Sequence, residues 1–196
     1  MENNQFTHFN EHGQARMVDV SSKESTAREA VAQGTVFMQP STLAAIMRDE
    51  IKKGNALEVA KIAGIMAAKH TSSLIPLCHP IPLTAIDLAF SIDQAQSSIT
   101  IESSVKTTAK TGVEMEALVA VSVAALTIYD MCKALDRAMR IGDIILVKKS
   151  GGQSGTFIRE QSAATIREQS AAANKMEDKS KVEDKSKERP GKEQES

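Results

Sequence analysis

The chain has very few aromatic residues and no tryptophan. Phe, Trp and Tyr make up only 3% of its 196 residues. This argues against a platform on which nucleic-acid bases stack, because such platforms are built from aromatic side chains. The formal net charge of -1 agrees, since nucleic-acid-binding proteins usually carry an excess of basic residues. We therefore predict that the chain does not bind nucleic acid.

Cysteine is scarce as well. Cys78 and Cys132 are the only two, too few and too far apart for a disulfide framework or a zinc ribbon. Reduced thiols in a cytosolic protein are the expected state. The sequence has no run of about 18–20 uncharged apolar residues, the length that a membrane span needs. The polar N-terminal stretch also lacks the apolar core of a secretory signal. We predict a cytoplasmic protein that does not enter a membrane.

Five stretches have the features of β-strands. Residues 84–92 and 98–106 alternate apolar and polar side chains on either side of a turn, which is typical of an antiparallel hairpin. Residues 29–38 end in β-branched and aromatic side chains, and 143–148 form a closing strand. Residues 17–20 form a shorter β-like run.

Three stretches are predicted to be helices. Apolar side chains recur with helical spacing in residues 43–51, and a second helix, 56–69, is capped by Asn55. The third starts at the capping pair Thr111–Gly112 and is apolar or small nearly all round between 115 and 128. Such a helix is buried on most sides, by its own domain or by a partner subunit. The apolar side chains of the second helix form one stripe, made by Val59, Ile62, Ala63, Met66 and Ala67.

The element order β, α, α, β, β, α, β predicts the fold class. It favours an antiparallel sheet with helices on one face, an α+β sandwich of the ferredoxin-like kind. We expect a flexible arm over 1–15, the folded domain over 16–158 and a low-complexity tail over 159–196. The tail repeats IREQSAA and EDKSK and has few large apolar residues. It cannot bury enough surface to offset chain entropy, so we expect it to be disordered, or helical only in its first half.

Residues 74–83, LIPLCHPIPL, cannot be helical because they contain three prolines. Each proline favours an extended conformation for the residue before it, so the segment holds Cys78 and His79 stiffly. His79 is either a loop histidine bonded to a carbonyl or a ligand-binding group, and the stiffening favours the second reading. Since no cluster at metal-ligand spacing accompanies His70 and His79, we expect no metal site.

The apolar helix ends abruptly in charged residues. Asp130 and Lys133 are three positions apart and therefore share one helix face. They form either a surface ion pair worth a few tenths of a kcal/mol, or a partly buried carboxylate that acts as a base or orients the lysine. Both readings stay open from the sequence.

Further basic residues precede a glycine-rich turn. Lys148 and Lys149 stand before GGQSG, whose backbone N–H groups can cradle an anion, although such a sequence is as often only a turn. The two lysines are either a solvated strand end or, with Lys53, Lys133 and Arg28, part of a cationic pocket for a polyphosphate.

Four motifs, LIPLCHP, KTGVEMEAL, AALTIYDMCKA and KSGGQSG, resemble a known family, as does MVDVS near the start. In unbroken order over roughly residues 10–158, they are similar to cyclic pyranopterin monophosphate synthases, the C accessory proteins of molybdenum cofactor biosynthesis. The resemblance implies a ferredoxin-like subunit in a homohexamer, a trimer of dimers. It implies conversion of 3′,8-cyclo-7,8-dihydroguanosine triphosphate into cyclic pyranopterin monophosphate with release of pyrophosphate. It implies no redox cofactor and leaves a role for Mg²⁺ open.

The resemblance also implies site residues, by motif position. The catalytic set would be Asp130, Lys53, Lys133 and Lys149. The substrate-binding set would be Leu77, Cys78, His79, Glu114, Met115, Glu116 and Arg28, the last from a mobile polar loop at 21–28. The chain departs from the family at Gln153, where a lysine is as readily expected, and in its tail.

The chemistry of this reaction suits these residues. A triphosphate needs several cations, and the Glu116 carboxylate can accept the N–H donors of a guanine edge. The rearrangement needs proton transfers and stabilisation of the leaving pyrophosphate, which Asp130 with a lysine can supply. We expect the apolar helix, buried between chains, to deliver Asp130 into a pocket shared with the Cys78–His79 segment.

Two other functions compete with a lyase. A nucleotide-binding or regulatory subunit would have the cationic pocket without turnover, and would release no pyrophosphate from the substrate. A purely structural oligomer would keep every ligand affinity unchanged after Lys149→Ala or His79→Ala.

Overall fold

The computed structural model describes residues 13–160, so most of the expected N-terminal arm and tail lie outside the described residues. The proposed domain boundaries stay predictions. Five strands form one sheet in the order β2-β3-β1-β4-β5, and every pair is antiparallel. The elements are β1 Thr26–Phe37, α1 Pro40–Met47, α2 Ala56–Lys69, α3 Thr71–Leu74, β2 Leu83–Asp93, β3 Ser98–Ala109, α4 Glu114–Cys132, β4 Arg140–Ser150 and β5 Phe157–Ile158.

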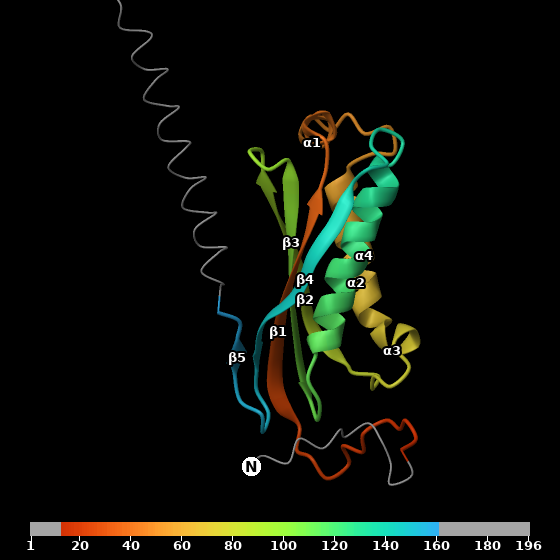
Figure 1. Ribbon diagram of the computed structural model, residues 1–196. Helices are drawn as coiled ribbons and strands as arrows, with labels where there is room; N and C mark the ends of the chain where they lie inside the picture. Colours follow the sequence, from red (N-terminus) through yellow and green to blue (C-terminus); the bar gives the residue numbers. More distant parts are fainter. Residues whose placement is uncertain (1–12, 161–196) are drawn as a thin grey trace, which may run out of the picture. The chain divides into compact units, whose positions relative to one another are not determined.

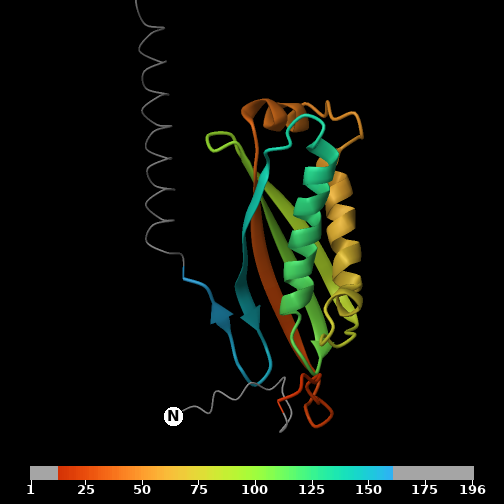
Figure 2. The same ribbon diagram turned by 45° about the vertical axis from the view of Figure 1, so that its right-hand side comes forward.

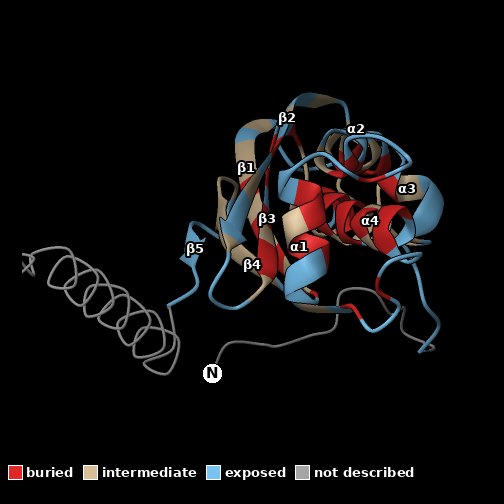
Figure 3. Ribbon diagram, turned by 90° about the horizontal axis from the view of Figure 1, so that it is seen from above, coloured by how far each residue is buried: buried red, intermediate tan, exposed pale blue. Residues whose placement is uncertain are grey.

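The helices α2 and α4 lie side by side and cover one face of the sheet (Figures 1 and 2). Within residues 13–160 no helix covers the other face of the sheet, and buried positions gather where α4 and α2 meet the strands (Figure 3). The expected α+β fold, with an antiparallel sheet and helices on one face, is therefore confirmed. The short α3 and β5 were not predicted.

The sheet follows from alternation along its strands. In β3 the side chains of Ile99, Ile101 and Val105 have no exposed surface, and they point to the helices as the pattern predicted. The hairpin β2–β3 is confirmed, with Leu88 opposite Ser103 in its register. Between the strands, Ser97 adopts a positive φ of 50°, which closes the predicted turn.

The helix α4 forms the centre of the core. Its side chains at Ala117, Ala120, Val121, Ala124, Ala125 and Ile128 are completely buried. By length and composition alone α4 is apolar enough to cross a membrane, with a mean hydropathy of 1.6, but 56% of that stretch is buried inside the protein. Burial on most sides is thus confirmed, with Leu126 as an exception at 58% exposure.

The packing of α2 against α4 uses small residues. The buried positions of α2 are Ala56, Ala60, Gly64, Ala67 and Ala68. The larger apolar side chains of the expected stripe point away from the core, since Val59, Ile62 and Met66 are 41%, 62% and 47% exposed. Small side chains occupy the core-facing positions because they let the backbones of α2 and α4 come close. The larger apolar side chains therefore form an apolar surface on the outside of α2.

Several predicted boundaries were wrong. The strand β1 begins at Thr26 instead of residue 29, because β3 is long enough to pair with it as far as Ala109. The helix α1 ends at Met47 instead of residue 51. Its end is a Schellman motif, in which Glu50 N donates to Ala45 O at 2.9 Å and Asp49 adopts a φ of 55°.

Two further local predictions differ from the structure. Residues 17–20 are not a strand; they run over the end of the sheet near β3. The residue at the N-cap of α4 is Val113, without a side-chain cap, in place of Thr111–Gly112. By contrast, Asn55 caps α2 as expected, since its side-chain oxygen accepts from Leu57 N and Glu58 N at 3.1 and 3.0 Å.

Candidate active site

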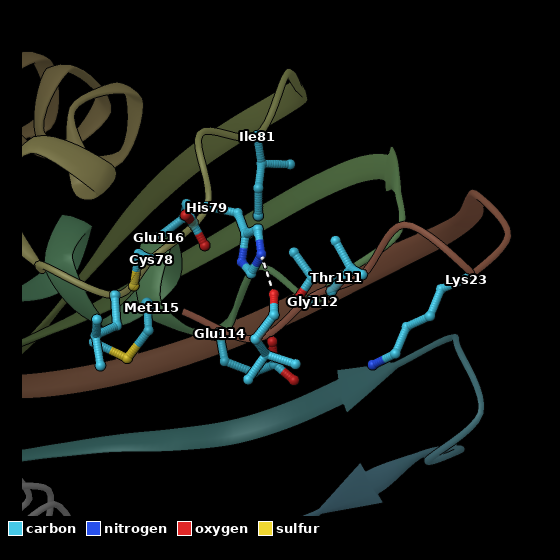
Figure 4. A pocket seen from close by; sticks show the side chains of 12 residues that line it. Lys23, Cys78, His79, Ile81, Thr111, Gly112, Glu114, Met115 and Glu116 are labelled. Atoms are coloured by element: carbon cyan, nitrogen blue, oxygen red, sulfur yellow. Dashed lines mark hydrogen bonds between the residues drawn. The ribbon is translucent and has the colours of Figure 1, made fainter. Parts of the chain in front are cut away.

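A pocket of about 290 Å³ lies where α4 begins. All six residues that the family motifs assign to substrate binding between positions 77 and 116 line it: Leu77, Cys78, His79, Glu114, Met115 and Glu116. They come from two segments, the proline-stiffened stretch and the first turn of α4, which the fold brings together (Figure 4). The two segments are far apart in the sequence. The hairpin of β2 and β3 lies between them and brings the start of α4 back to the proline-stiffened stretch.

Burial shifts the pKa values of two groups in the pocket, one carboxyl and one thiol. Glu116 is only 3% exposed, and desolvation raises the pKa of its carboxyl, helped by the negative charge of Glu114. Burial also raises the pKa of the Cys78 thiol, and the Glu116 charge adds to this. Cys78 therefore stays a neutral thiol at physiological pH, which makes it a polar wall of the pocket and not a thiolate nucleophile.

The structure confirms one of the two alternatives for His79, the contact with a carbonyl, and its role in ligand binding stays a prediction. Its Nε2 lies 2.8 Å from the backbone oxygen of Val18, so it is bonded to a carbonyl, and the same side chain lines the pocket. Because a carbonyl can only accept, Nε2 carries the proton in this contact. His79 thus ties the N-terminal segment to the pocket.

Sequence reasoning missed the N-terminal wall of this pocket. Val18, Val20 and Lys23 line it, and the Lys23 side chain extends from its loop toward the pocket (Figure 4). The polar composition of residues 21–28 suggested only a mobile loop. A lysine inside the motif-bearing N-terminal stretch was the available signal.

A second pocket, of about 650 Å³, lies beside the first. It is lined by Ser22, Lys23, Glu24, Thr26, Arg28, Gly152, Gln153 and Ser154, so the glycine-rich turn and Arg28 do come together. The guanidinium of Arg28 is partly engaged, since Nε donates to Ala109 O at 3.0 Å and Nη2 to Lys110 O at 3.2 Å. The Thr26 hydroxyl oxygen is buried without a hydrogen-bond partner.

The two lysines at the end of β4 have different surroundings. Lys148 pairs with Glu29 at 2.9 Å on the uncovered face of the sheet. Lys149 donates to the hydroxyl of Ser154, beside the second pocket. Lys148 is therefore part of a strand-surface ion pair, and Lys149 is the one of the two that reaches the glycine-rich turn.

The far end of α4 holds a separate charged cluster, in which one carboxylate binds two ammonium groups. Asp130 Oδ1 lies 2.7 Å from Lys133 Nζ, and Oδ2 lies 2.8 Å from Lys53 Nζ. Lys53 also donates to the backbone oxygen of Asp130 at 2.8 Å. The turn before α2 thus places Lys53 against the last turn of α4.

This arrangement sets the ionisation of the cluster. The bond from Lys133 and then that from Lys53 lower the pKa of Asp130 to about 2, and Asp130 in turn raises the pKa of Lys133. Asp130 is exposed, with a side chain 55% accessible. Asp130 is ionised at neutral pH and pairs with two lysines, as the surface ion-pair alternative predicted. The expectation of a partly buried carboxylate is wrong, because its side chain faces solvent, and its role as a base or as an orienter of the lysine stays a prediction.

Within one chain the two clusters are well separated. Glu116 and Asp130 lie near opposite ends of α4, which runs from Glu114 to Cys132, and at 1.5 Å per residue this places them about 21 Å apart along the helix axis. The single pocket expected from the sequence, with Asp130 beside His79, is therefore not formed by one chain. Lys149 lies near the end of β4, at the same end of the sheet as the first residues of β1.

No metal ligand set is found in residues 13–160, where no group of three or more His, Cys, Asp or Glu side chains is arranged to hold an ion. The thiols of Cys78 and Cys132 are both free.

Comparison with known proteins places these features in context. The sequence model of the MoaC family matches residues 17–152. A cyclic pyranopterin monophosphate synthase of Heliobacterium modesticaldum is 63% identical over 155 residues, covering 79% of this chain and 98% of the relative. The protein of the same name from Thermoanaerobacter sp. strain X514 is 62% identical over 154 residues, with 79% and 98% covered. The one from Syntrophomonas wolfei is 62% identical over 155 residues, with 79% and 99% covered.

Proposed function

Because this chain belongs to the MoaC family, we propose that it makes cyclic pyranopterin monophosphate, the product for which its relatives are named. The enzyme is a lyase of molybdenum cofactor biosynthesis. Its substrate is 3′,8-cyclo-7,8-dihydroguanosine triphosphate, and pyrophosphate leaves as the cyclic phosphate closes. The observation that carries the proposal is the extent of the family match, since residues 17–152 include both the pocket and the Asp130 cluster.

The pocket at the start of α4 is suited to the purine-derived part of the substrate. Glu116 is buried and lines the pocket, so it can accept two N–H donors of a guanine edge. A ligand that brings these donors would offset the cost of the buried charge. Cys78, His79, Leu77 and Met115 would then form the walls around the base, and Glu114 would complete the rim.

The cations are suited to the phosphates. Lys53 and Lys133 share Asp130, and an arriving phosphate group would compete with that carboxylate for both ammonium groups. As the lysines turned to the phosphate, the pKa of Asp130 would rise from about 2 and the carboxylate would become a better proton acceptor. Lys149 and Arg28 would serve the remaining phosphates and the leaving pyrophosphate.

We further propose that the active site is shared between two chains of a homohexamer, a trimer of dimers. The support is the distance between the two clusters within one chain, because one substrate molecule cannot reach both. The exposed apolar side chains of Ile62 and Met66 on α2 and Leu126 on α4 give further support, since a soluble monomer rarely leaves such a surface uncovered. A partner chain would bring its Asp130 to the pocket at His79.

We propose that the reaction runs without a resident redox cofactor, in the cytoplasm. Substrate and products balance without electrons from outside, and the two free thiols agree with a reducing compartment. Dependence on Mg²⁺ can be measured directly, as turnover after treatment with a chelator and again after Mg²⁺ is restored.

The test of the function is turnover by the purified full-length protein. Wild type should release one pyrophosphate per pyranopterin formed from the cyclised nucleotide. Asp130→Asn should reduce kcat by at least about 100-fold, because general acid–base groups typically contribute factors of 10² to 10⁴. Asp87→Asn is the matched control, since Asp87 pairs with Lys61 at 3.0 Å on the exposed surface. Unimpaired turnover by Asp130→Asn would remove Asp130 from the chemistry.

A further inference from the structure

The N-terminal segment 17–25, here called the strap, crosses the end of the sheet beside both pockets. It is irregular and buries little of itself: Met17 is 49% exposed, and residues 21–25 are all exposed. Apolar burial therefore contributes little to fixing its position. Its place must depend strongly on the polar contacts that join it to the rest of the fold.

Two side chains bond to backbone oxygens of the strap. His79 Nε2 lies 2.8 Å from Val18 O, and Lys110 Nζ donates to Ser21 O at 2.6 Å. Between these points the strap turns on itself, with Ser21 N donating to Asp19 Oδ1 at 2.8 Å and Lys23 N donating to Val20 O at 3.0 Å. Lys110 thus holds the strap at the turn that leads directly into Lys23.

Lys23 is the residue whose position this contact decides. It lines the pocket around His79 and also the second pocket with Arg28 and the glycine-rich turn. Its side chain extends from the strap toward the first pocket (Figure 4). An ammonium group at the junction of the two pockets can bind an anion that spans them.

Lys110 is itself firmly placed. It follows β3 directly, and its backbone oxygen accepts from Arg28 Nη2 at 3.2 Å, while the preceding Ala109 O accepts from Arg28 Nε at 3.0 Å. The lysine therefore joins the strap to a paired strand end. Asp19 is a charged group close to its ammonium: hydrogen bonds from Ser21, and more weakly the positive charges of Lys110 and Arg16, lower the pKa of Asp19.

We propose that Lys110 is a positioning residue: by holding the strap at Ser21, it places Lys23 at the junction of the two pockets, where Lys23 binds the phosphate part of the ligand. Lys110 does not line either of these pockets; it acts through Lys23. The inference rests on the proposed function for the identity of the ligand, and not for the effect on the strap.

The first test needs no ligand. In Lys110→Met, amide hydrogen exchange in residues 18–25 should become about tenfold faster, since a hydrogen bond from a charged donor is lost. Exchange in α4 should not change. Lys61→Met, which removes the exposed ion pair between Lys61 on α2 and Asp87 on β2, is the matched control and should leave the strap unaffected. Unchanged exchange in the strap of Lys110→Met would overturn the proposal.

The second test asks whether Lys110 acts through Lys23. Binding of inorganic pyrophosphate is measured by calorimetry for wild type, Lys23→Met, Lys110→Met and the double variant. Each single change should weaken binding about tenfold, and the double variant should bind no more weakly than Lys23→Met alone, because the two residues form one unit. Lys110→Arg should recover most of the affinity. Two independent, additive losses would show that Lys110 acts on its own and would refute the inference.

This design separates the two proposals. If the wild-type protein failed to turn over the cyclised nucleotide while the exchange and pyrophosphate results held, the proposed function would fail and the role of Lys110 would stand.

Discussion

At the scale of single residues, the two carboxylates at the ends of α4 are in opposite electrostatic environments. Asp130 is exposed and bonded to two ammonium groups, whereas Glu116 is buried at the pocket. Neighbouring cations favour the charged form of the first, and desolvation disfavours the charged form of the second. One helix therefore carries a carboxyl group with a lowered pKa at one end and one with a raised pKa at the other.

The low pKa of Asp130 should depend on its lysines. In Lys133→Met the pKa of Asp130 should rise from about 2 toward its ordinary value of 3.8, because the hydrogen bond from Lys133, which lowers this pKa most, is lost. Carboxyl titration by NMR measures this, with Lys69→Met at the end of α2 as control. Because the pKa of Asp130 is lower in the folded protein than in the unfolded chain, its ionised form stabilises the fold at pH values above the unfolded pKa. This contribution is lost as the pH falls through about 2. An Asp130 titration that did not move would contradict the assignment of the bond.

Glu116 should carry a cost in stability. The pKa of Glu116 is higher in the folded protein than in the unfolded chain. The protonated carboxyl therefore favours the folded state at pH values below the unfolded pKa, and this contribution is lost as the pH rises through the folded pKa. Glu116→Gln should therefore be more stable than wild type at pH 8, while binding substrate more weakly. Urea unfolding at pH 5 and pH 8 measures this. The difference in free energy of unfolding between Glu116→Gln and wild type should grow with pH. An equal or reversed difference would argue against burial as the cause.

At the scale of elements, the close contact of α2 and α4 is what fixes the site. It holds Lys53, which precedes α2, against the last turn of α4, where Asp130 lies. The contact is made by small side chains, and Gly64 is one of the buried residues of α2 that face α4. A Cβ there would lie 2.5 Å from Leu88 Cδ2 and 2.9 Å from Ala120 O. The side chain of Leu88 can move aside, but the backbone oxygen of Ala120 belongs to α4 and moves only with the helix.

Gly64→Ala should therefore destabilise the protein, although alanine is the better helix former. We expect a loss of about 1–3 kcal/mol in the free energy of unfolding, as for other overpacked cores, measured by chemical denaturation. Lys61→Ala on the same helix removes only a surface ion pair and should cost less than about 1 kcal/mol. A Gly64→Ala protein as stable as wild type would show that α2 and α4 are less tightly packed than described.

At the scale of the whole molecule, the separation of the two clusters underlies the proposal that two copies of the chain share each site. One chain presents a pocket at the start of α4 and two lysines with Asp130 at its end, with an apolar surface exposed on α2 between them. In a symmetric dimer each chain would give its pocket to one site and its Asp130 cluster to the other. Both sites would then be complete.

This arrangement predicts complementation between inactive variants. Asp130→Asn and His79→Ala should each have little activity alone. When the two are co-expressed in equal amounts, random pairing makes half the dimers mixed, each with one intact site, so about a quarter of wild-type activity should return. Turnover per chain measures this, and light scattering gives the size of the assembly. Mixed protein no more active than its parents would rule out a shared site.

The sequence by itself determined where the longer helices and strands form, but it did not reveal α3 or β5 and wrongly suggested a strand at 17–20. Local periodicity, the Asn55 cap and the β2–β3 turn act over a few residues, so they can be read without the fold. The motifs identified the family and, with it, six of the nine residues from 77 to 116 that line the pocket. The ends of α1 and β1 were misplaced, because backbone geometry after Met47 and pairing with β3 decided them.

Only the tertiary structure decided which surfaces meet. It buried the face of α2 that carries small side chains and left Ile62 exposed, and it paired Lys148 with Glu29. It brought Lys110 against the irregular strap that carries Lys23. It also set the pocket and Asp130 at opposite ends of one helix. These outcomes depend on contacts between residues far apart in the chain, and no local pattern of side chains records them.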